Sequence, residues 1–255
     1  MASRETLRIV FSLDATIVGH LKAQGLQFEF MKPKEGELGL GPKVLGVMAE
    51  LGIPTTFSDS AGRAASPVSS DAWRRPLSAG GLKLHCAELP AMRQIVLTVE
   101  ELEPGSSRSW DAWVSPFLGD TRFVQAWITD AEYDFWQNAS QILEYEAVGK
   151  PFRHLPLISN GLPPPLQGQN IDTSSNPGRT IIRQGYIEAV GSKMWLGQLF
   201  WAAVQRDFET VGDVVGVSIG RQSDLGIVVL VSDRDLTDPG SSETQIRMRQ
   251  QLYGT

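Results

Sequence analysis

The stretch Leu7-Arg8-Ile9-Val10-Phe11-Ser12-Leu13 decides the fold, because every second residue, from Leu7 to Leu13, is a large apolar one. This period of two is typical of a β-strand with one face on an apolar core. Segments rich in β-branched and apolar residues predict further strands at 27–30, 94–99, 123–128, 180–190 and 226–231. Gly185 would form a bulge in the fourth of these. The last, GIVVLV, is apolar on both faces, so we expect the sheet to be covered on both sides there.

Helical spacing of apolar residues predicts four helices, at 42–51, 130–143, 199–208 and 239–253. Pro42 suits the first turn of the first helix, and Gly52 is placed to end it in a left-handed conformation. In the last helix, Ile246, Arg249 and Tyr253 form one stripe.

Strands and helices interleave along the chain without a regular βαβα order. The predicted fold class is therefore α+β, with a mixed, largely antiparallel sheet and flanking helices.

The composition changes sharply between Ile158 and Gly178, where the chain reads ISNGLPPPLQGQNIDTSSNPG. Three successive prolines favour an extended conformation, and either a linker or a long functional loop fits this composition. We favour the loop, because the 77 residues after it (255 minus 178) share a core with the first part more easily than they build their own. Residues 1–255 are thus expected to form a single α+β domain, with this Pro/Gly-rich loop (158–178) separating two sub-parts.

The composition also argues against several classes of function. With 23 basic and 29 acidic side chains in 255 residues the net charge is −6, which disfavours a general nucleic-acid-binding protein. One cysteine, Cys86, and three histidines without metal-ligand spacing disfavour a metal centre, and we expect no cofactor. Apolar runs reach about five residues, whereas a membrane span needs about 20 and a signal peptide an apolar region of about 7–15. The expectation is a cytoplasmic protein that binds neither membranes nor nucleic acid.

Three segments resemble catalytic or ligand-binding motifs but are incomplete. Residues 36–43 are glycine-rich, yet Pro42 separates the glycine from the lysine of a phosphate-binding loop. The acids at 130, 132 and 134 alternate like calcium ligands, without the glycine and glutamate that close a calcium loop. His85 and Cys86 are adjacent and face opposite sides of a strand, so they form no dyad. Carboxylates can still converge in space, which leaves a small hydrolase or transferase with carboxylates near the 158–178 loop as the alternative function.

Acidic residues are concentrated in one part of the chain. From Val99 to Glu146 there are ten acids and two bases, a charge of −8, while the remainder carries +2. An acidic solvated face explains this, and so does a surface complementary to a basic protein partner. The candidate contacts of the second reading are Glu100, Glu101, Glu103, Asp130, Glu132 and Asp134.

Three segments of the last third, GYIEAV (185–190), MWLGQLFW (194–201) and RMRQQLYG (247–254), carry a family resemblance. In this order and spacing they resemble the immunity protein 52 family of bacterial polymorphic toxin systems. The signature depends mainly on Met194, Trp195, Leu196, Gly197, Phe200 and Trp201. Because this run has the apolar density of a core segment, we expect it to fix the fold rather than to contact a partner.

The resemblance implies an α+β immunity protein rather than an enzyme. Such a protein would bind and neutralise a cognate nuclease toxin with a restriction-endonuclease-like fold, such as a type VI secretion effector, by stoichiometric contact. The partner would present a basic surface to the acidic residues above. Occlusion of the toxin's active site and disruption of its assembly both remain open, as does the oligomeric state.

Overall fold

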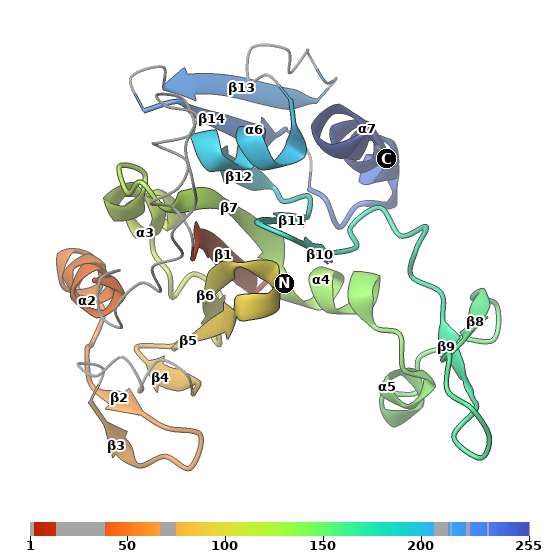
Figure 1. Ribbon diagram of the computed structural model, residues 1–255. Helices are drawn as coiled ribbons and strands as arrows, with labels where there is room; N and C mark the ends of the chain where they lie inside the picture. The colour runs from red at the N-terminus through yellow and green to blue at the C-terminus, as the bar shows by residue number, and fades with distance from the viewer. Residues whose placement is uncertain are drawn as a thin grey trace.

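The computed structural model describes residues 3–13, 39–66, 75–206, 214, 216–222, 225–233 and 235–254 (Figure 1). Ten strands form its main sheet: β1 (Glu5–Ser12), β2 (Phe57–Ser58), β3 (Ala64–Ala65), β4 (Leu77–Ala79), β5 (Leu82–Leu89), β6 (Gln94–Glu101), β7 (Phe123–Asp130), β12 (Lys193–Leu196), β13 (Val217–Gln222) and β14 (Ile227–Ser232). Their order across the sheet is β13-β14-β12-β7-β1-β6-β5-β4-β2-β3. Each neighbouring pair of these strands is antiparallel.

Two small hairpins lie outside this sheet, β8 (Leu157–Ser159) with β9 (Gln169–Ile171) and β10 (Ile181–Arg183) with β11 (Tyr186–Glu188). The helices are α2 (Leu40–Glu50), α3 (Trp110–Val114), α4 (Ala131–Asn138), α5 (Ile142–Ala147), α6 (Gln198–Val204) and α7 (Ser242–Tyr253), with short 3₁₀ turns at Pro90–Met92, Ser115–Phe117 and Pro239–Ser241. The α+β fold class is confirmed. The sheet is more uniformly antiparallel than predicted, since no parallel pair occurs among the described strands.

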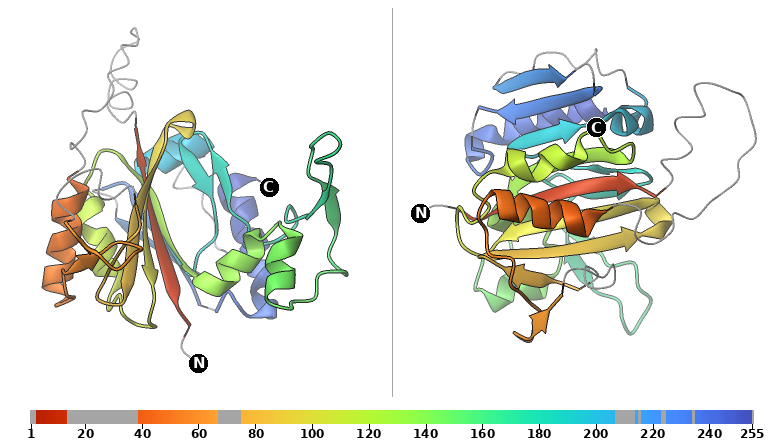
Figure 2. Two further views of the ribbon diagram at one scale, coloured as in Figure 1. Left: turned by 90° about the horizontal axis from the view of Figure 1, so that it is seen from below. Right: turned by 90° about the vertical axis from the view of Figure 1, so that its left-hand side faces the viewer.

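Both faces of the sheet carry an apolar core. Leu7, Ile9 and Phe11 of β1 pack on one face with residues of α2 and α3, and Val10 packs on the other with residues of α6 and α7. Figure 2 shows α2 and α3 on one side of the sheet and α6 and α7 on the other. The prediction that both faces of β14 are covered is confirmed. Ile227 packs in the core on the α2 and α3 side of the sheet, and Val228 packs in the core on the α6 and α7 side.

The helix predicted at 42–51 is α2, and its C-terminal end is confirmed. It begins at Leu40, two residues before the predicted start, and Gly52 follows it with a φ of 63°. The Gly52 N–H donates to Ala49 O, and the Ile53 N–H donates to Met48 O. These two bonds satisfy carbonyls at the helix end in the way that a left-handed C-terminal glycine permits.

Two predicted elements differ from the structure, and a third cannot be compared with it. The helix predicted at 130–143 is divided into α4 and α5, because Ala139 is extended and Gln141 starts a new capping box with Glu144. The strand predicted at 180–190 is the hairpin β10–β11, and Gly185, with a φ of 84°, lies in its turn instead of a bulge. The predicted strand at 27–30 lies outside the described residues.

The loop predicted at 158–178 contains regular structure, since β8 and β9 pair across it. After it, β12 pairs with β7, so the last third extends the same sheet as the first part. The stripe predicted for α7 is wrong at Ile246, which is exposed. The buried face of this helix is formed by Gln245, Met248, Arg249 and Leu252. No helix in the described parts of the chain has the length and apolar character needed to cross a membrane.

Candidate partner-binding surfaces

The predicted acidic contacts meet at one end of the sheet, because β1 lies between β6 and β7. Glu5 at the start of β1 pairs with Asp130 of β7, and its N–H donates to the Glu101 carboxylate of β6 at 3.1 Å. Burial raises the pKa of Glu5, the indole N–H of Trp110 at 2.6 Å opposes this rise, and the charges of Glu101, Asp130 and Asp235 add to it. Two of the predicted acidic segments are therefore neighbours in space.

Glu101 and Asp134 are buried, however, which contradicts their prediction as surface contacts. Glu101 is 2% exposed, and its second carboxylate oxygen accepts from the N–H of Ser107 at 3.1 Å. Asp134 is 8% exposed and pairs with the guanidinium of Arg8 at 2.7 Å. Asp130 is partly exposed, but its side chain caps α4 by accepting from the Tyr133 N–H at 2.7 Å. These three carboxylates stabilise the fold, and the role of the partly exposed Asp130 in partner binding stays a prediction.

Three of the predicted contacts keep their carboxylates toward solvent. Glu103 and Glu132 are exposed, and Glu100 is partly exposed and pairs with Lys83 at 3.0 Å. On α5, Glu146 is also exposed. The role of Glu100, Glu103 and Glu132 in partner binding stays a prediction.

The signature run 194–201 lies inside the molecule. Met194, Leu196 and Phe200 are fully buried, and Trp195 and Trp201 are nearly so. Gly197 joins β12 to α6 where the chain passes close to β7, and a Cβ there would lie 2.9 Å from the Phe123 carbonyl oxygen. The six signature residues therefore shape the junction of sheet and helix, and within the run Gln198 alone is exposed.

One segment projects from the molecule. The sequence did not identify it as a surface. We call residues 142–171 the arm; it comprises α5, β8, β9 and their connections, and it extends away from the sheet (Figures 1 and 2). A small separate core fixes its base, with Tyr145 and Ile171 buried beside Ala139. The Tyr145 ring lies 4.9 Å from that of Trp136, and its hydroxyl donates to Ala139 O at 3.1 Å.

Large apolar side chains are unusually exposed on the arm. Thirteen are exposed in the described chain, and six of them lie in these 30 residues: Leu143, Val148, Leu157, Ile158, Leu162 and Leu166. Monomeric proteins rarely gather exposed apolar side chains in one place, and such patches commonly mark protein-interaction sites. The proline-rich composition marked this segment in the sequence, but the exposure of its leucines could not be read from it.

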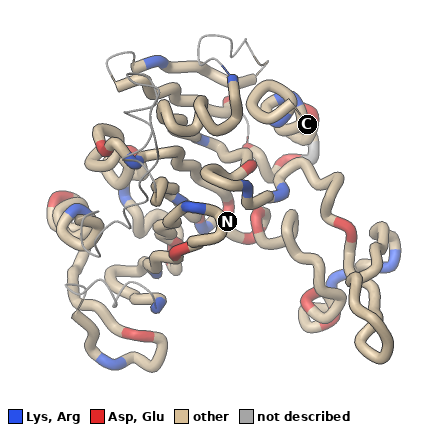
Figure 3. The backbone as a smooth tube through the Cα atoms, in the orientation of Figure 1, with Lys and Arg blue, Asp and Glu red and all other residues tan. Residues whose placement is uncertain are grey.

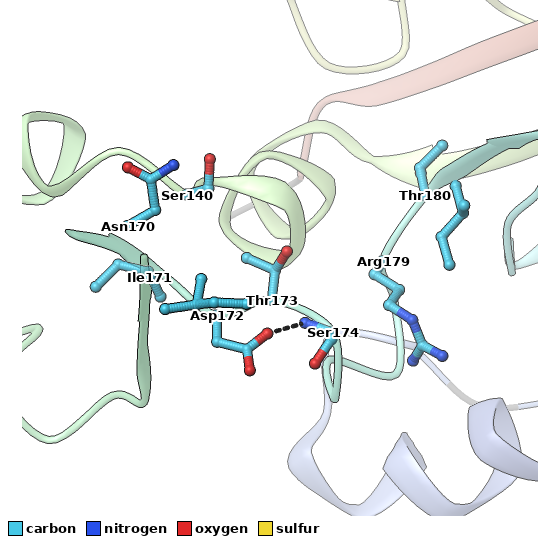
Figure 4. A pocket seen from close by; sticks show the side chains of 10 residues that line it. Ser140, Asn170, Ile171, Asp172, Thr173, Ser174, Arg179 and Thr180 are labelled. Atoms are coloured by element: carbon cyan, nitrogen blue, oxygen red, sulfur yellow. Dashed lines mark hydrogen bonds between the residues drawn. The ribbon is translucent and has the colours of Figure 1, made fainter. Parts of the chain in front are cut away.

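A pocket of about 450 Å³ lies at the base of the arm. Its lining combines isoleucines with polar residues, among them Ser140, Asn170, Thr173 and Arg179, and Asp172 is the one carboxylate among its described lining residues (Figure 4). The Ser174 side chain and, at 2.9 Å, the Ser174 N–H lower the pKa of Asp172 by hydrogen bonding to its carboxylate. A general acid needs the opposite shift, and glycoside-type hydrolysis needs a second carboxylate. The pocket therefore gives little support to the alternative enzymatic function.

Among the residues that the structure describes, no cluster of three or more His, Cys, Asp or Glu side chains has the arrangement of a metal site. Searches of family models, curated proteins and solved structures found no significant match to this chain.

Proposed function

We propose that this protein acts by binding another protein, as an immunity protein that neutralises a nuclease toxin with a basic surface. The observation that carries the proposal is the arm, which holds six exposed large apolar side chains on a fixed backbone. Burying such side chains against a partner is favourable by about 25 cal/mol for each Å² of apolar surface. The nuclease and its toxin system come from the resemblance of residues 185–190, 194–201 and 247–254 to the immunity protein 52 family.

The charge of the chain supports a basic partner. The net charge is −6, and Glu103, Glu132 and Glu146 are exposed on three different segments. A nuclease needs positive groups to hold phosphates, so an acidic protein attracts it over a distance and accelerates their encounter. Acids that are neutralised by internal ion pairs, such as Asp134 with Arg8, add little to this long-range attraction.

Co-expression with the gene product of the adjacent reading frame tests the proposal. We expect the protein to restore the growth of cells that express this product and to co-purify with it in a fixed ratio. The matched control is the same vector carrying the protein with Trp195→Asp, which places a charge in the core and abolishes folding. Growth arrest that the folded wild-type protein does not relieve, together with no co-purification, contradicts the proposed function.

A further inference from the structure

Arg249 of α7 is buried with most of its hydrogen-bonding capacity unused. Its side chain is closed off from solvent, with the residue 1% exposed, and its Nε–H donates to Pro177 O at 2.7 Å. Its two terminal nitrogens, Nη1 and Nη2, are buried and have no hydrogen-bond partner among the described residues. Buried charged groups are normally hydrogen-bonded, because a charge in the interior without partners is costly.

The carboxylate beside Arg249 is already paired with another residue. Glu188 of β11 is buried too, and its Oε1 accepts from Nε of Arg183 at 2.6 Å. Its Oε2 lies 3.8 Å from Arg249 Nη1, which is beyond hydrogen-bond distance, and this oxygen has no hydrogen-bond partner in the described chain. Arg183 and Arg249 therefore share one negative charge.

Arg179 brings a further positive charge to Arg249. Burial lowers the pKa of Arg249 to about 10, and the positive charge of Arg179 contributes to this shift. The Arg179 guanidinium donates to Asn176 O at 3.0 Å, and Figure 4 shows its side chain directed toward α7. Figure 3 shows basic positions both in this segment and on α7. Two guanidinium groups that repel each other are stabilised by a negative charge placed between them.

The pocket at the base of the arm gives access to Arg179. Arg179 is partly exposed and lines this pocket of about 450 Å³ together with Ser140, Asn170, Thr173 and three isoleucines. Small-molecule sites commonly combine apolar side chains with a few polar groups that fix the orientation of the ligand. The pocket can therefore hold the uncharged part of a small organic molecule whose charged end reaches Arg179.

The geometry and the charge of the site define its ligand. Nη1 and Nη2 of one guanidinium form a fork that matches two oxygens of a carboxylate or a phosphate. Glu188 near Arg249 and Asp172 in the pocket are both acids, so each additional negative charge on the ligand is unfavourable. A carboxylate carries one negative charge, whereas a phosphate group carries about −1.5 to −2 at neutral pH.

We propose that a small organic carboxylate binds between Arg179 and Arg249, with its oxygens accepting from Nη1 and Nη2 of Arg249 and its remainder in the pocket at the base of the arm. Because Arg249 is closed off from solvent, the ligand enters when the partly exposed Arg179 moves aside. The bound carboxylate would join α7 to the segment that follows the arm. This inference does not depend on the proposed function.

Thermal unfolding with added carboxylates tests the site. Sodium acetate, lactate and butyrate are each added at about 10 mM and compared with sodium chloride at the same ionic strength. At least one of them should raise the Tm of the wild type by about 3 °C or more, the shift expected for a dissociation constant near 1 mM. Arg153→Ala is the matched control, because Arg153 is an exposed arginine on the arm. This control should show the same shift as the wild type.

Two variants remove the proposed contacts. Arg179→Ala changes a partly exposed residue, and Arg249→Met keeps the apolar length of the side chain without its charge. Both should show a shift of less than about 1 °C with the same acid. Arg179→Ala alone decides the question if Arg249→Met does not fold.

Three results would overturn the inference. One is an equal shift in Arg179→Ala and Arg153→Ala, which would place the carboxylate elsewhere on the protein. Another is a wild type whose Tm none of the three acids raises. The third is a larger shift with sodium phosphate at the same concentration than with any of the carboxylates, which would assign the site to phosphate.

Discussion

Asp134 illustrates how a side chain that looks like a surface acid becomes structural. It lies on α4, and one of its carboxylate oxygens is 2.7 Å from the Arg8 guanidinium of β1 while the other accepts from Asn138 at 3.3 Å. The same guanidinium has a buried nitrogen without a hydrogen-bond partner, so Asp134 is needed to balance the charge of Arg8. Charge reversal at 130, 132 and 134 together would therefore damage the fold, and only Glu132→Lys reports on the surface.

Asp134→Ala should lower the free energy of unfolding by about 2 kcal/mol, because it leaves the partly buried Arg8 without an opposite charge. Glu132→Ala, at an exposed position of the same helix, should change it by less than about 0.5 kcal/mol. Urea denaturation followed by tryptophan fluorescence measures both values. Equal stability of the two variants would show that the Arg8–Asp134 pair contributes nothing.

At the scale of elements, the arm is expected to open independently of the sheet. Its base depends on Tyr145, whose ring packs between Trp136 at 4.9 Å and Phe152 at 6.2 Å, apart from the two cores of the sheet. A segment with few buried apolar contacts opens with a lower free energy than the core of the molecule.

Tyr145→Ala should raise the rate of proteolytic cleavage within 157–171 more than about tenfold, with little change in the main unfolding transition. Phe200→Ala is the control, since Phe200 is fully buried in a core of the sheet and its loss should lower the main transition. Limited proteolysis with mass spectrometry and calorimetry distinguish these effects. A main transition lowered equally by both substitutions contradicts an independently opening arm.

The sequence predicted those elements whose pattern is local. Alternation at 7–13 and the apolar run at 226–231 identified β1 and β14, and Gly52 identified the end of α2. Whether Gly185 forms a bulge or a turn depends on what its two flanks pair with, and they pair with each other. The burial of Glu101 and Asp134 depends on Glu5 and Arg8, which are 96 and 126 residues away in the chain, so no local pattern could show it.

At the scale of the whole molecule, four acids from separate parts of the chain meet at one end of the sheet: Glu5, Glu101, Asp130 and Asp235. Because burial and these charges raise the pKa of Glu5 above its ordinary value of 4.5, folding favours its protonated form. This stabilisation is complete below the ordinary pKa and is lost as the pH rises through the higher pKa of the folded state.

Glu5→Gln removes this dependence, so the free energy of unfolding of the variant relative to wild type should increase from about pH 4 to about pH 7. Urea titrations at several pH values measure the difference. Glu103→Gln, which removes one exposed negative charge, is the control. A Glu5→Gln difference that stays constant or falls over this range contradicts a raised pKa.

The place of β1 in the middle of the sheet has a consequence for biosynthesis. The ribosome makes this strand before its two neighbours, β6 and β7, which follow about 90 and 120 residues later. At roughly 5–20 residues per second, the ribosome needs several seconds to deliver them. During that interval the nascent chain carries the apolar strand LRIVFSL without its native neighbouring strands, which makes it a natural target for chaperones that shield emerging polypeptides.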